Sequence, residues 1–154
     1  MAIYLASQNK LKPIKEKGVN LERDIQKLTE ENLETLFGLK FVSGLSNNEF
    51  SVRVQEQDFY IDTLAFDEQQ SSFVIIEYKK DRNFSVIDQG FSYLSAMLRN
   101  KAEFVLELNR RLGKNYDKND IDWEQSRLIF ILLNSPTIKR MLLISKTCLS
   151  HSMR

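Results

Sequence analysis

The fold is decided by residues 59–79, FYIDTLAFDEQQSSFVIIEYK, in which two apolar runs are joined by a polar link. Strands are expected at 58–66 and 72–79, because these runs have the length and the β-branched and aromatic content that are typical of strands. The link 67–71 is short enough for a hairpin. Both runs are apolar on both faces, so we expect both strands to lie in the middle of a sheet. The charged exceptions are Asp62, Glu77 and Lys79.

These three charges need a chemical reason to stand among core residues, because charged groups are almost never buried unless they are paired or bind a metal. Side chains alternate along a strand, so Glu77 and Lys79 point to the same face. Pairing of the two strands then brings Asp62 beside Glu77. Two carboxylates and an ammonium suit divalent-metal hydrolysis, since Mg²⁺ binds carboxylates together with waters and phosphate oxygens. The alternative for Glu77 and Lys79 alone is a solvated ion pair at a strand end.

Further elements are expected on either side of this stretch. A helix from about Asn20 to Gly38 is predicted by an apolar stripe at helical spacing, made of Leu21, Ile25, Leu28, Asn32 and Leu36. Strands are expected at 40–43, 49–54 and 126–133, and helices at 84–98 and 101–112. The order is a helix, three or four strands, two helices and a strand, or α-β-β-β-α-α-β in the shorter count. It predicts an α/β fold with a central mixed sheet of about four to five strands flanked by helices.

One domain is expected at 20–134, after a loosely ordered lead-in at 1–19 and before a basic tail at 135–154. The end of the chain is basic because residues 125–154 contain no Asp or Glu, and their charged residues are Arg127, Lys139, Arg140, Lys146 and Arg154. The tail is interpreted either as a phosphate-contacting extension or as a segment of foreign composition, and its lack of clean periodicity slightly favours the second.

The composition excludes several classes of protein. The chain has 154 residues, 42% of them hydrophobic, and no apolar stretch approaches the roughly 20 residues of a membrane span. The start lacks the pattern of a secretory signal. Cys148 is the only cysteine and His151 the only histidine, which excludes an internal disulfide and makes a His-based triad or a zinc site improbable. We therefore expect a cytoplasmic protein without a membrane association.

A family resemblance rests on the spacing of the acids. Asp62, followed after fourteen intervening residues by Glu77-Tyr78-Lys79, resembles the signature of the PD-(D/E)XK, restriction-endonuclease-like nuclease superfamily. Gln89-Gly90-Phe91-Ser92-Tyr93 resembles the Gln-x-x-x-Tyr motif of the helicase-associated exonuclease branch. The expected element order also fits that fold over residues 20–133. The sequence departs from the pattern at Ile61, where many members have proline.

The resemblance implies a role for each matched residue. Asp62 and Glu77 would bind Mg²⁺ or Mn²⁺ together with the backbone carbonyl of Tyr78, and Lys79 would position or activate the hydrolytic water. Gln89 and Tyr93 would line the site and contact the DNA backbone; the alternative is a solvent-facing Gln and an ordinary core Tyr. The further residues singled out are Lys80 as a phosphate contact, Glu22 as the acid that many members add from the first helix, and Trp123 and Tyr116 as aromatic side chains near a polar loop.

These observations predict a metal-dependent nuclease that hydrolyses DNA phosphodiester bonds with a metal-activated water. Mg²⁺ is the expected cofactor, and Mn²⁺ is expected to substitute for it. DNA is the expected partner, and a homodimer is left open. The alternative is a catalytically inactive module of the same fold that binds nucleic acid or a protein. The alternative for Glu22 is that it is not a site residue but an acid at the start of a helix, where the positive end of the helix dipole favours it. For Trp123 and Tyr116, packing under the loop is favoured over base stacking.

Overall fold

The computed structural model describes the backbone of residues 4–7, 10–13, 22–45, 47, 49–54, 56–79, 85–134 and 137–145. Side chains are described within 22–45, 47, 49–54, 56–79 and 88–132. The helices are α1 (Glu22–Glu31), α2 (Leu33–Phe37), α3 (Ser85–Arg99), α4 (Lys101–Leu112) and the short 3₁₀ helix η1 (Lys118–Asp120). The strands are β1 (Tyr4–Ser7), β2 (Lys10–Pro13), β3 (Lys40–Ser43), β4 (Phe50–Val54), β5 (Gln57–Ile61), β6 (Thr63–Asp67), β7 (Ser72–Lys79), β8 (Arg127–Asn134) and β9 (Thr137–Ser145).

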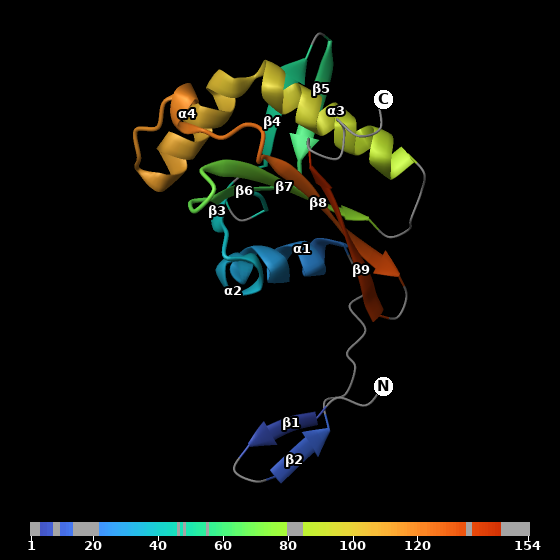
Figure 1. Cartoon of the computed structure of the whole chain (residues 1–154). Coiled ribbons are helices and arrows are strands. Elements are labelled where there is room, and N and C mark those ends of the chain that lie inside the picture. The colour runs from blue at the N-terminus through green and yellow to red at the C-terminus, as the bar shows by residue number, and fades with distance from the viewer. Residues whose placement is uncertain are drawn as a thin grey trace.

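The main sheet has five strands in the order β3-β6-β7-β8-β9 (Figure 1). β7 and β8 are parallel and the other neighbours are antiparallel, so the sheet is mixed. The chain returns from β7 to β8 through α3 and α4, the kind of crossover that a parallel pair requires. The expected α/β architecture with a mixed central sheet flanked by helices is thus confirmed at this level.

Helices cover both faces of this sheet (Figure 1). On one face, Phe73 and Ile75 of β7 belong to a core that includes residues of α3 and α4. On the other face, Val74, Ile76 and Tyr78 belong to a second core that includes residues of α1 and α2. The strict alternation along β7 explains why residues 73–76 of this strand are all apolar, because both faces of the strand are buried.

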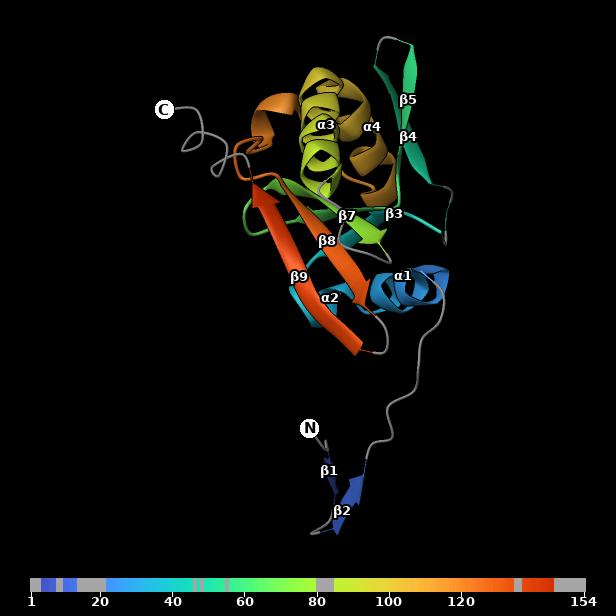
Figure 2. The ribbon, with the colours of Figure 1, turned by 90° about the vertical axis from the view of Figure 1, so that its right-hand side faces the viewer.

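The strand expected at 58–66 is wrong in one respect, since the chain breaks at Asp62 into two strands. β5 pairs with β4 in a separate two-stranded ribbon, whereas β6 pairs with β3 and β7 in the main sheet. Figure 2 shows this ribbon projecting from the sheet beside α3 and α4. The physical reason is that Asp62 lies where the chain passes from one sheet to the other. Its carbonyl accepts a hydrogen bond from the Gln26 side chain rather than from a strand.

The first helix also differs from its prediction. It is interrupted at Asn32, whose side-chain amide donates to the carbonyl of Leu28, and it continues as the short helix α2. Gly38 ends α2 in the left-handed conformation, as expected of a C′ glycine. Ile25 is buried, but Leu28 and Leu36 are 53% and 55% exposed, so the predicted stripe is not the buried face. The face that packs on the sheet includes polar side chains.

The ends of the chain carry strands where none were expected. β1 and β2 form an antiparallel hairpin within the predicted lead-in. β9 pairs with β8 along residues 137–145, within the segment expected as a basic tail. The segment has adjacent basic residues followed by adjacent apolar ones and no alternation, so its sequence carries no strand signal. Among the described residues, no helix is long and apolar enough to cross a membrane.

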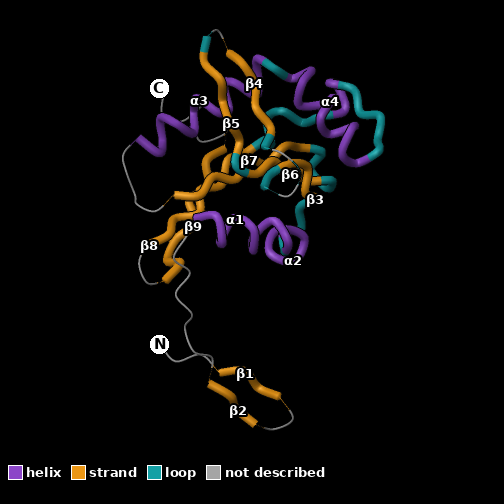
Figure 3. Tube along the Cα trace, turned by 180° about the vertical axis from the view of Figure 1, so that it is seen from behind, coloured by secondary structure: helices purple, strands orange, loops and turns teal. Residues whose placement is uncertain are grey.

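Figure 3 shows the same arrangement from behind, with the helices on both sides of the strands.

Candidate functional site

Asp62 and Glu77 lie next to each other where β5 ends and β6 begins. Thr63 pairs with Ile76 at this end of the β6–β7 ladder, so Asp62 and Glu77 occupy the next opposed positions. The Asp62 backbone N–H donates to Glu77 Oε1 at 3.4 Å. The Tyr78 N–H in turn donates to Asp62 Oδ2 at 3.2 Å. The two carboxylates that were linked from the sequence are therefore adjacent. Each accepts a hydrogen bond from a backbone N–H of the opposite segment.

Lys79 belongs to the same group. Its Nζ lies 3.6 Å from Glu77 Oε2, and both side chains share one face of β7 because they are two residues apart. The Lys79 side chain is 32% exposed, whereas that of Glu77 is 1% exposed. The lysine therefore stands at the solvent side of a buried carboxylate. Among the described residues, Lys79 is the cation whose charge lowers the pKa of both Asp62 and Glu77.

The acid pair is poorly compensated electrostatically. Burial, followed by the charge of Asp62, raises the pKa of Glu77 to about 8, and Lys79 offsets this only in part. Burial also raises the pKa of Asp62, against the hydrogen bond from the Tyr78 N–H and the charge of Lys79. Both shifts have the cause expected for two acids crowded in a place of low solvation. Such a pair favours a bound proton or a bound cation.

Without divalent cations, the free energy of unfolding is expected to fall as pH rises from about 5 to 8. In the folded protein Glu77 keeps its proton up to a pKa of about 8, whereas in the unfolded chain it ionises near its ordinary value of 4.5. The folded state therefore binds more protons in this window, and stability decreases with pH. At about 1.36 kcal/mol for each pKa unit, the fall amounts to a few kcal/mol. Urea unfolding at pH 5, 6.5 and 8 measures it.

The matched variant for this measurement is Glu77→Gln, which should show a much flatter profile over the same range. Asp67 and Glu107 act in the opposite sense, because their arginine partners lower their pKa values. Their contribution is lost only below their ordinary pKa values of 3.8 and 4.5, outside the window. An identical pH profile in the wild type and in Glu77→Gln would contradict the raised pKa of Glu77.

Tyr93 and Gln89 of α3 lie beside this pair. The Tyr93 hydroxyl donates to the carbonyl of Tyr60 at 2.8 Å, and its ring packs edge-to-face on Phe59. Burial raises the pKa of Tyr93, and the charges of Glu77 and Asp62 add to this shift. Gln89 is half-buried, and its side chain opposes the rise in the pKa of Tyr93. Tyr93 is thus both a core residue and a neighbour of the acids, so the two alternatives of the sequence analysis are combined in one side chain.

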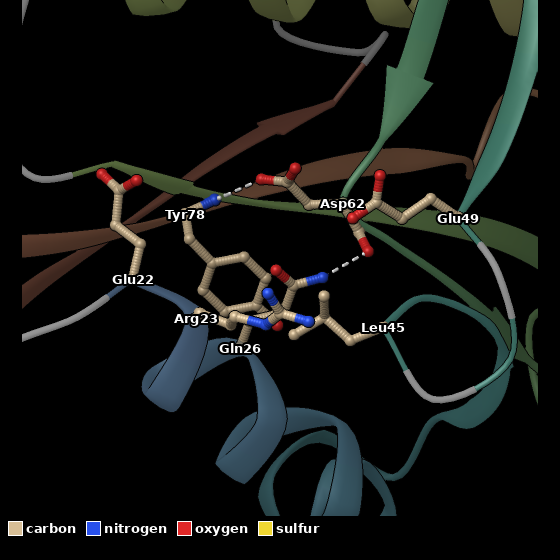
Figure 4. Close-up of a pocket in the computed structure, with 7 residues that line it drawn as sticks. All are labelled: Glu22, Arg23, Gln26, Leu45, Glu49, Asp62 and Tyr78. Atoms are coloured by element: carbon tan, nitrogen blue, oxygen red, sulfur yellow. Dashed lines mark hydrogen bonds between the residues drawn. The ribbon is translucent and has the colours of Figure 1, made fainter.

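A pocket of about 290 Å³ opens on the side of Asp62 that faces α1 (Figure 4). Its lining residues are Glu22, Arg23, Gln26, Leu45, Glu49, Asp62 and Tyr78. Glu22 is half-buried at the start of α1, so the acid expected from the first helix shares a pocket with Asp62. Glu31 is exposed. Lys80 lies outside the described residues, and so do Cys148 and His151.

Glu49 is an acid of this pocket that sequence reasoning missed. Its charge raises the pKa of Asp62, and Figure 4 shows its carboxylate on the Asp62 side of the pocket. The pairing of Phe50 with Ile61 brings Glu49 and Asp62 to the foot of the same ribbon. The sequence offered no signal for this, because it did not reveal that segment 49–54 pairs with 57–61.

A buried polar network below the pocket was also missed. Gln26 Nε2 donates to the Asp62 carbonyl at 2.7 Å and to Glu30 Oε1 at 3.0 Å. Glu30 Oε1 also accepts from the Leu45 N–H and from Thr63 Oγ1, at 3.1 and 2.8 Å. The only signal in the sequence was that Gln26 and Glu30 are four residues apart next to Ile25, on one side of a helix. The network ties α1 to the main chain of Asp62.

The donor set fits a hard divalent cation in its chemistry. Asp62 and Glu77 offer two carboxylates, and Mg²⁺ commonly takes one or two carboxylates and completes its shell with waters and phosphate oxygens. The raised pKa of Glu77 marks a place where positive charge would be stabilised. Within the described part of the chain, no group of three or more His, Cys, Asp or Glu residues is arranged to hold a metal ion. The protein ligands would therefore be few.

Trp123 and Tyr116 do not belong to the site. The Trp123 ring lies 5.6 Å from that of Phe73, and its Nε1–H donates to the carbonyl of Lys118. Tyr116 packs against Phe66. Both rings help to close the core under the loop after α4, which is the packing alternative of the sequence analysis.

Comparison with known proteins gives one informative relative. No family model matches the chain, and no solved structure matches it. A Haemophilus influenzae protein described as uncharacterized is 44% identical over 131 residues, which is 85% of this chain. The chain spans 41% of the length of that relative. The chain is therefore similar to part of a longer bacterial protein.

Proposed function

We propose that this chain is a metal-dependent nuclease of the restriction-endonuclease-like fold, which hydrolyses phosphodiester bonds of DNA. The observation that carries the proposal is the meeting of Asp62, Glu77 and Lys79 at one opening of the sheet, with Glu77 buried and its pKa raised to about 8. A buried and strongly perturbed titratable group beside a specific charge partner is typical of functional sites.

The order of elements supports the proposed fold. Helix α1 precedes three strands that are neighbours in the sheet, β3, β6 and β7, and the chain then crosses through α3 and α4 to the parallel strand β8. Asp62 immediately precedes β6, and Glu77 and Lys79 lie at the end of β7. The β4–β5 ribbon is an insertion between β3 and β6 in this scheme. The ribbon forms its own sheet, so β3 and β6 remain neighbours in the main sheet.

In this proposal Asp62 and Glu77 hold Mg²⁺ or Mn²⁺, and the carbonyl of Tyr78 stays a predicted third ligand. A cation held there would lower the pKa of a water molecule and would neutralise charge that develops on the phosphate. Lys79, at the solvent side of Glu77, holds the attacking water. The water oxygen forms the new bond to phosphorus as one bridging P–O bond breaks. The water gives up one proton to solvent and the departing oxygen takes one from solvent, so the products are a phosphate monoester and a free hydroxyl. Gln89 contacts the DNA backbone, while Tyr93 keeps Tyr60 and Glu77 in place.

Calorimetric titration with Mg²⁺ or Mn²⁺, with and without a DNA oligonucleotide, is expected to show binding of the cation. The same protein is expected to cleave labelled DNA only when the cation is present, because the empty acid pair has no means to activate water. Ca²⁺ serves as the control cation, since it accepts the same oxygen ligands with less strict geometry. A protein that binds DNA but neither binds Mg²⁺ or Mn²⁺ nor cleaves would instead be the inactive nuclease-fold module.

A further inference from the structure

The β4–β5 ribbon has one face packed on helices and one face that is uncovered. Its inner face packs through Phe50, which meets Phe104 of α4 at 5.0 Å, and through Phe59, which meets Tyr93 of α3 at 6.0 Å. Because side chains alternate along a strand, the intervening residues face outward. These outer residues are Ser51, Arg53, Asp58 and Tyr60, and all four are exposed.

The outer face runs directly to the acid pair. Ser51 pairs with Tyr60, and Arg53 pairs with Asp58 farther from the main sheet. Tyr60 is two residues before Asp62, a separation of roughly 6–7 Å along an extended chain. Tyr60 is therefore the first outward side chain that a strand of nucleic acid would meet after leaving the carboxylates along this ribbon. Figure 2 shows the ribbon rising from the sheet on this side of the molecule.

The Tyr60 side chain is exposed, while its backbone is held by a hydrogen bond and by strand pairing. The residue is 59% exposed, and its cross-strand neighbour is the small Ser51. Its carbonyl accepts the 2.8 Å hydrogen bond from Tyr93, the same residue that borders Glu77. Tyr93 of α3 therefore contacts the backbone of Tyr60 and also borders the acid pair. An exposed aromatic ring on a rigid support loses little conformational freedom when a planar group stacks on it.

No other described aromatic residue combines exposure with this position. Trp123 is only 8% exposed. Phe91 is 37% exposed but lies two residues from both Gln89 and Tyr93 on α3, about 200° around the helix from each, so it points away from them. A single exposed apolar side chain is ordinary on a protein surface. The feature that distinguishes Tyr60 is its fixed place beside the acids.

We propose that Tyr60 is a stacking platform for an unpaired base next to the scissile phosphate, and that the substrate at this site is single-stranded DNA or a frayed DNA end. The inference rests on the proposed nuclease function and adds a substrate class to it. Aromatic side chains bind single strands by stacking on bases of any sequence. A base inside a duplex already stacks on its neighbours and has no free face to offer. The platform therefore distinguishes single strands from duplexes.

Equilibrium binding tests this inference without depending on cleavage. Fluorescence anisotropy in EDTA compares a labelled single strand with the same strand in a duplex, using the full chain as wild type, Tyr60→Ala, Tyr60→Trp and Leu106→Ala. Leu106 is 69% exposed on α4 and controls for the removal of an exposed apolar side chain. Tyr60→Ala is expected to weaken single-strand binding about tenfold, at the low end of stacking energies. Tyr60→Trp and Leu106→Ala should bind the single strand within about twofold of wild type. The affinity for the duplex should be unchanged in all three variants.

A strand with one abasic site, moved along the sequence, supplies the second arm. At one position of the abasic site, wild-type binding should weaken about tenfold, whereas the binding of Tyr60→Ala should not change. The reason is that loss of the base and loss of the Tyr60 ring remove the same stacking contact. Three results would overturn the inference. They are equal affinities of wild type and Tyr60→Ala for the single strand, an equal loss of affinity for single strand and duplex in Tyr60→Ala, and a wild-type protein that does not bind single strands. Cleavage of duplexes alone would keep the nuclease and reject the platform. Tyr60-dependent binding without any metal-dependent cleavage would keep the platform and reject the nuclease.

Discussion

Replacement of Glu77 by alanine is expected to reduce metal-dependent DNA cleavage by roughly 1000-fold or more, because a bound cation contributes several kcal/mol to the stabilisation of the transition state. Asp62→Ala should have an effect of the same size, since the two carboxylates adjoin at the end of the β6–β7 ladder. Lys79→Ala should also abolish activity through the loss of the group that holds the water. Initial rates on a labelled strand at saturating Mg²⁺ measure all three.

Loss of activity in these variants should not come from loss of the fold. Burial and the neighbouring Asp62 oppose ionisation of Glu77, so its removal takes away a group whose charged form is unfavourable in the folded protein. Glu77→Gln keeps the shape of the side chain and is the stricter test. Glu68→Ala, at an exposed acid in the turn between β6 and β7, is the matched control and should retain wild-type rates. Full nuclease activity in Glu77→Ala, from a preparation with a clean background, would refute the mechanism.

Glu30→Ala is expected to lower the free energy of unfolding by about 3 kcal/mol or more, since each buried donor left without an acceptor costs roughly 1–3 kcal/mol. Three donors lose the same oxygen, namely Gln26 Nε2, the Leu45 N–H and Thr63 Oγ1. Gln26 would also lose the anchor that holds its amide against the Asp62 carbonyl. Urea unfolding measures the effect. Glu31→Ala, at the next and exposed acid of α1, should stay within about 0.5 kcal/mol of wild type.

A double-mutant cycle with Gly44 tests whether the carboxylate acts through its place in the network. A Cβ at Gly44 would collide with the Glu30 side chain, so Gly44→Ala should be destabilising in the wild-type background. In the Glu30→Ala background the same change should cost much less, because the group that it displaces is gone. If the losses in the free energy of unfolding are additive, Gly44→Ala does not destabilise the protein through its contact with Glu30.

The sequence predicted the parts of the site that depend on local alternation. Along β7, the period of two places Glu77 and Lys79 on one face, whatever the strand packs against. The short polar link at 67–71 pairs this strand with the segment that precedes it, and that pairing brings Asp62 beside Glu77. Helix α4 and its glycine end at Gly113 follow equally local rules.

Other parts of the site depend on contacts between distant residues and gave no readable signal. The break at Asp62 exists because Ile61 pairs with Phe50 while Thr63 pairs with Ile76, and an apolar run looks the same with or without such a change of partner. Glu49 reaches the pocket through that same pairing. Gln26 and Glu30 are ordinary polar helix residues until α1 packs against the sheet, and the apolar stripe pointed to Leu28, which is exposed.

The sequence by itself determined an α/β chain in which two acids and a lysine meet at the end of paired strands, because strand periodicity and hairpin pairing are encoded within about twenty neighbouring residues. Only the tertiary structure decided how strongly Glu77 is buried, how α1 supports the main chain of Asp62, and that the exposed ring of Tyr60 stands beside the acids. The reason is physical: desolvation, helix packing and the change of strand partner at Asp62 are set by residues far away in the sequence.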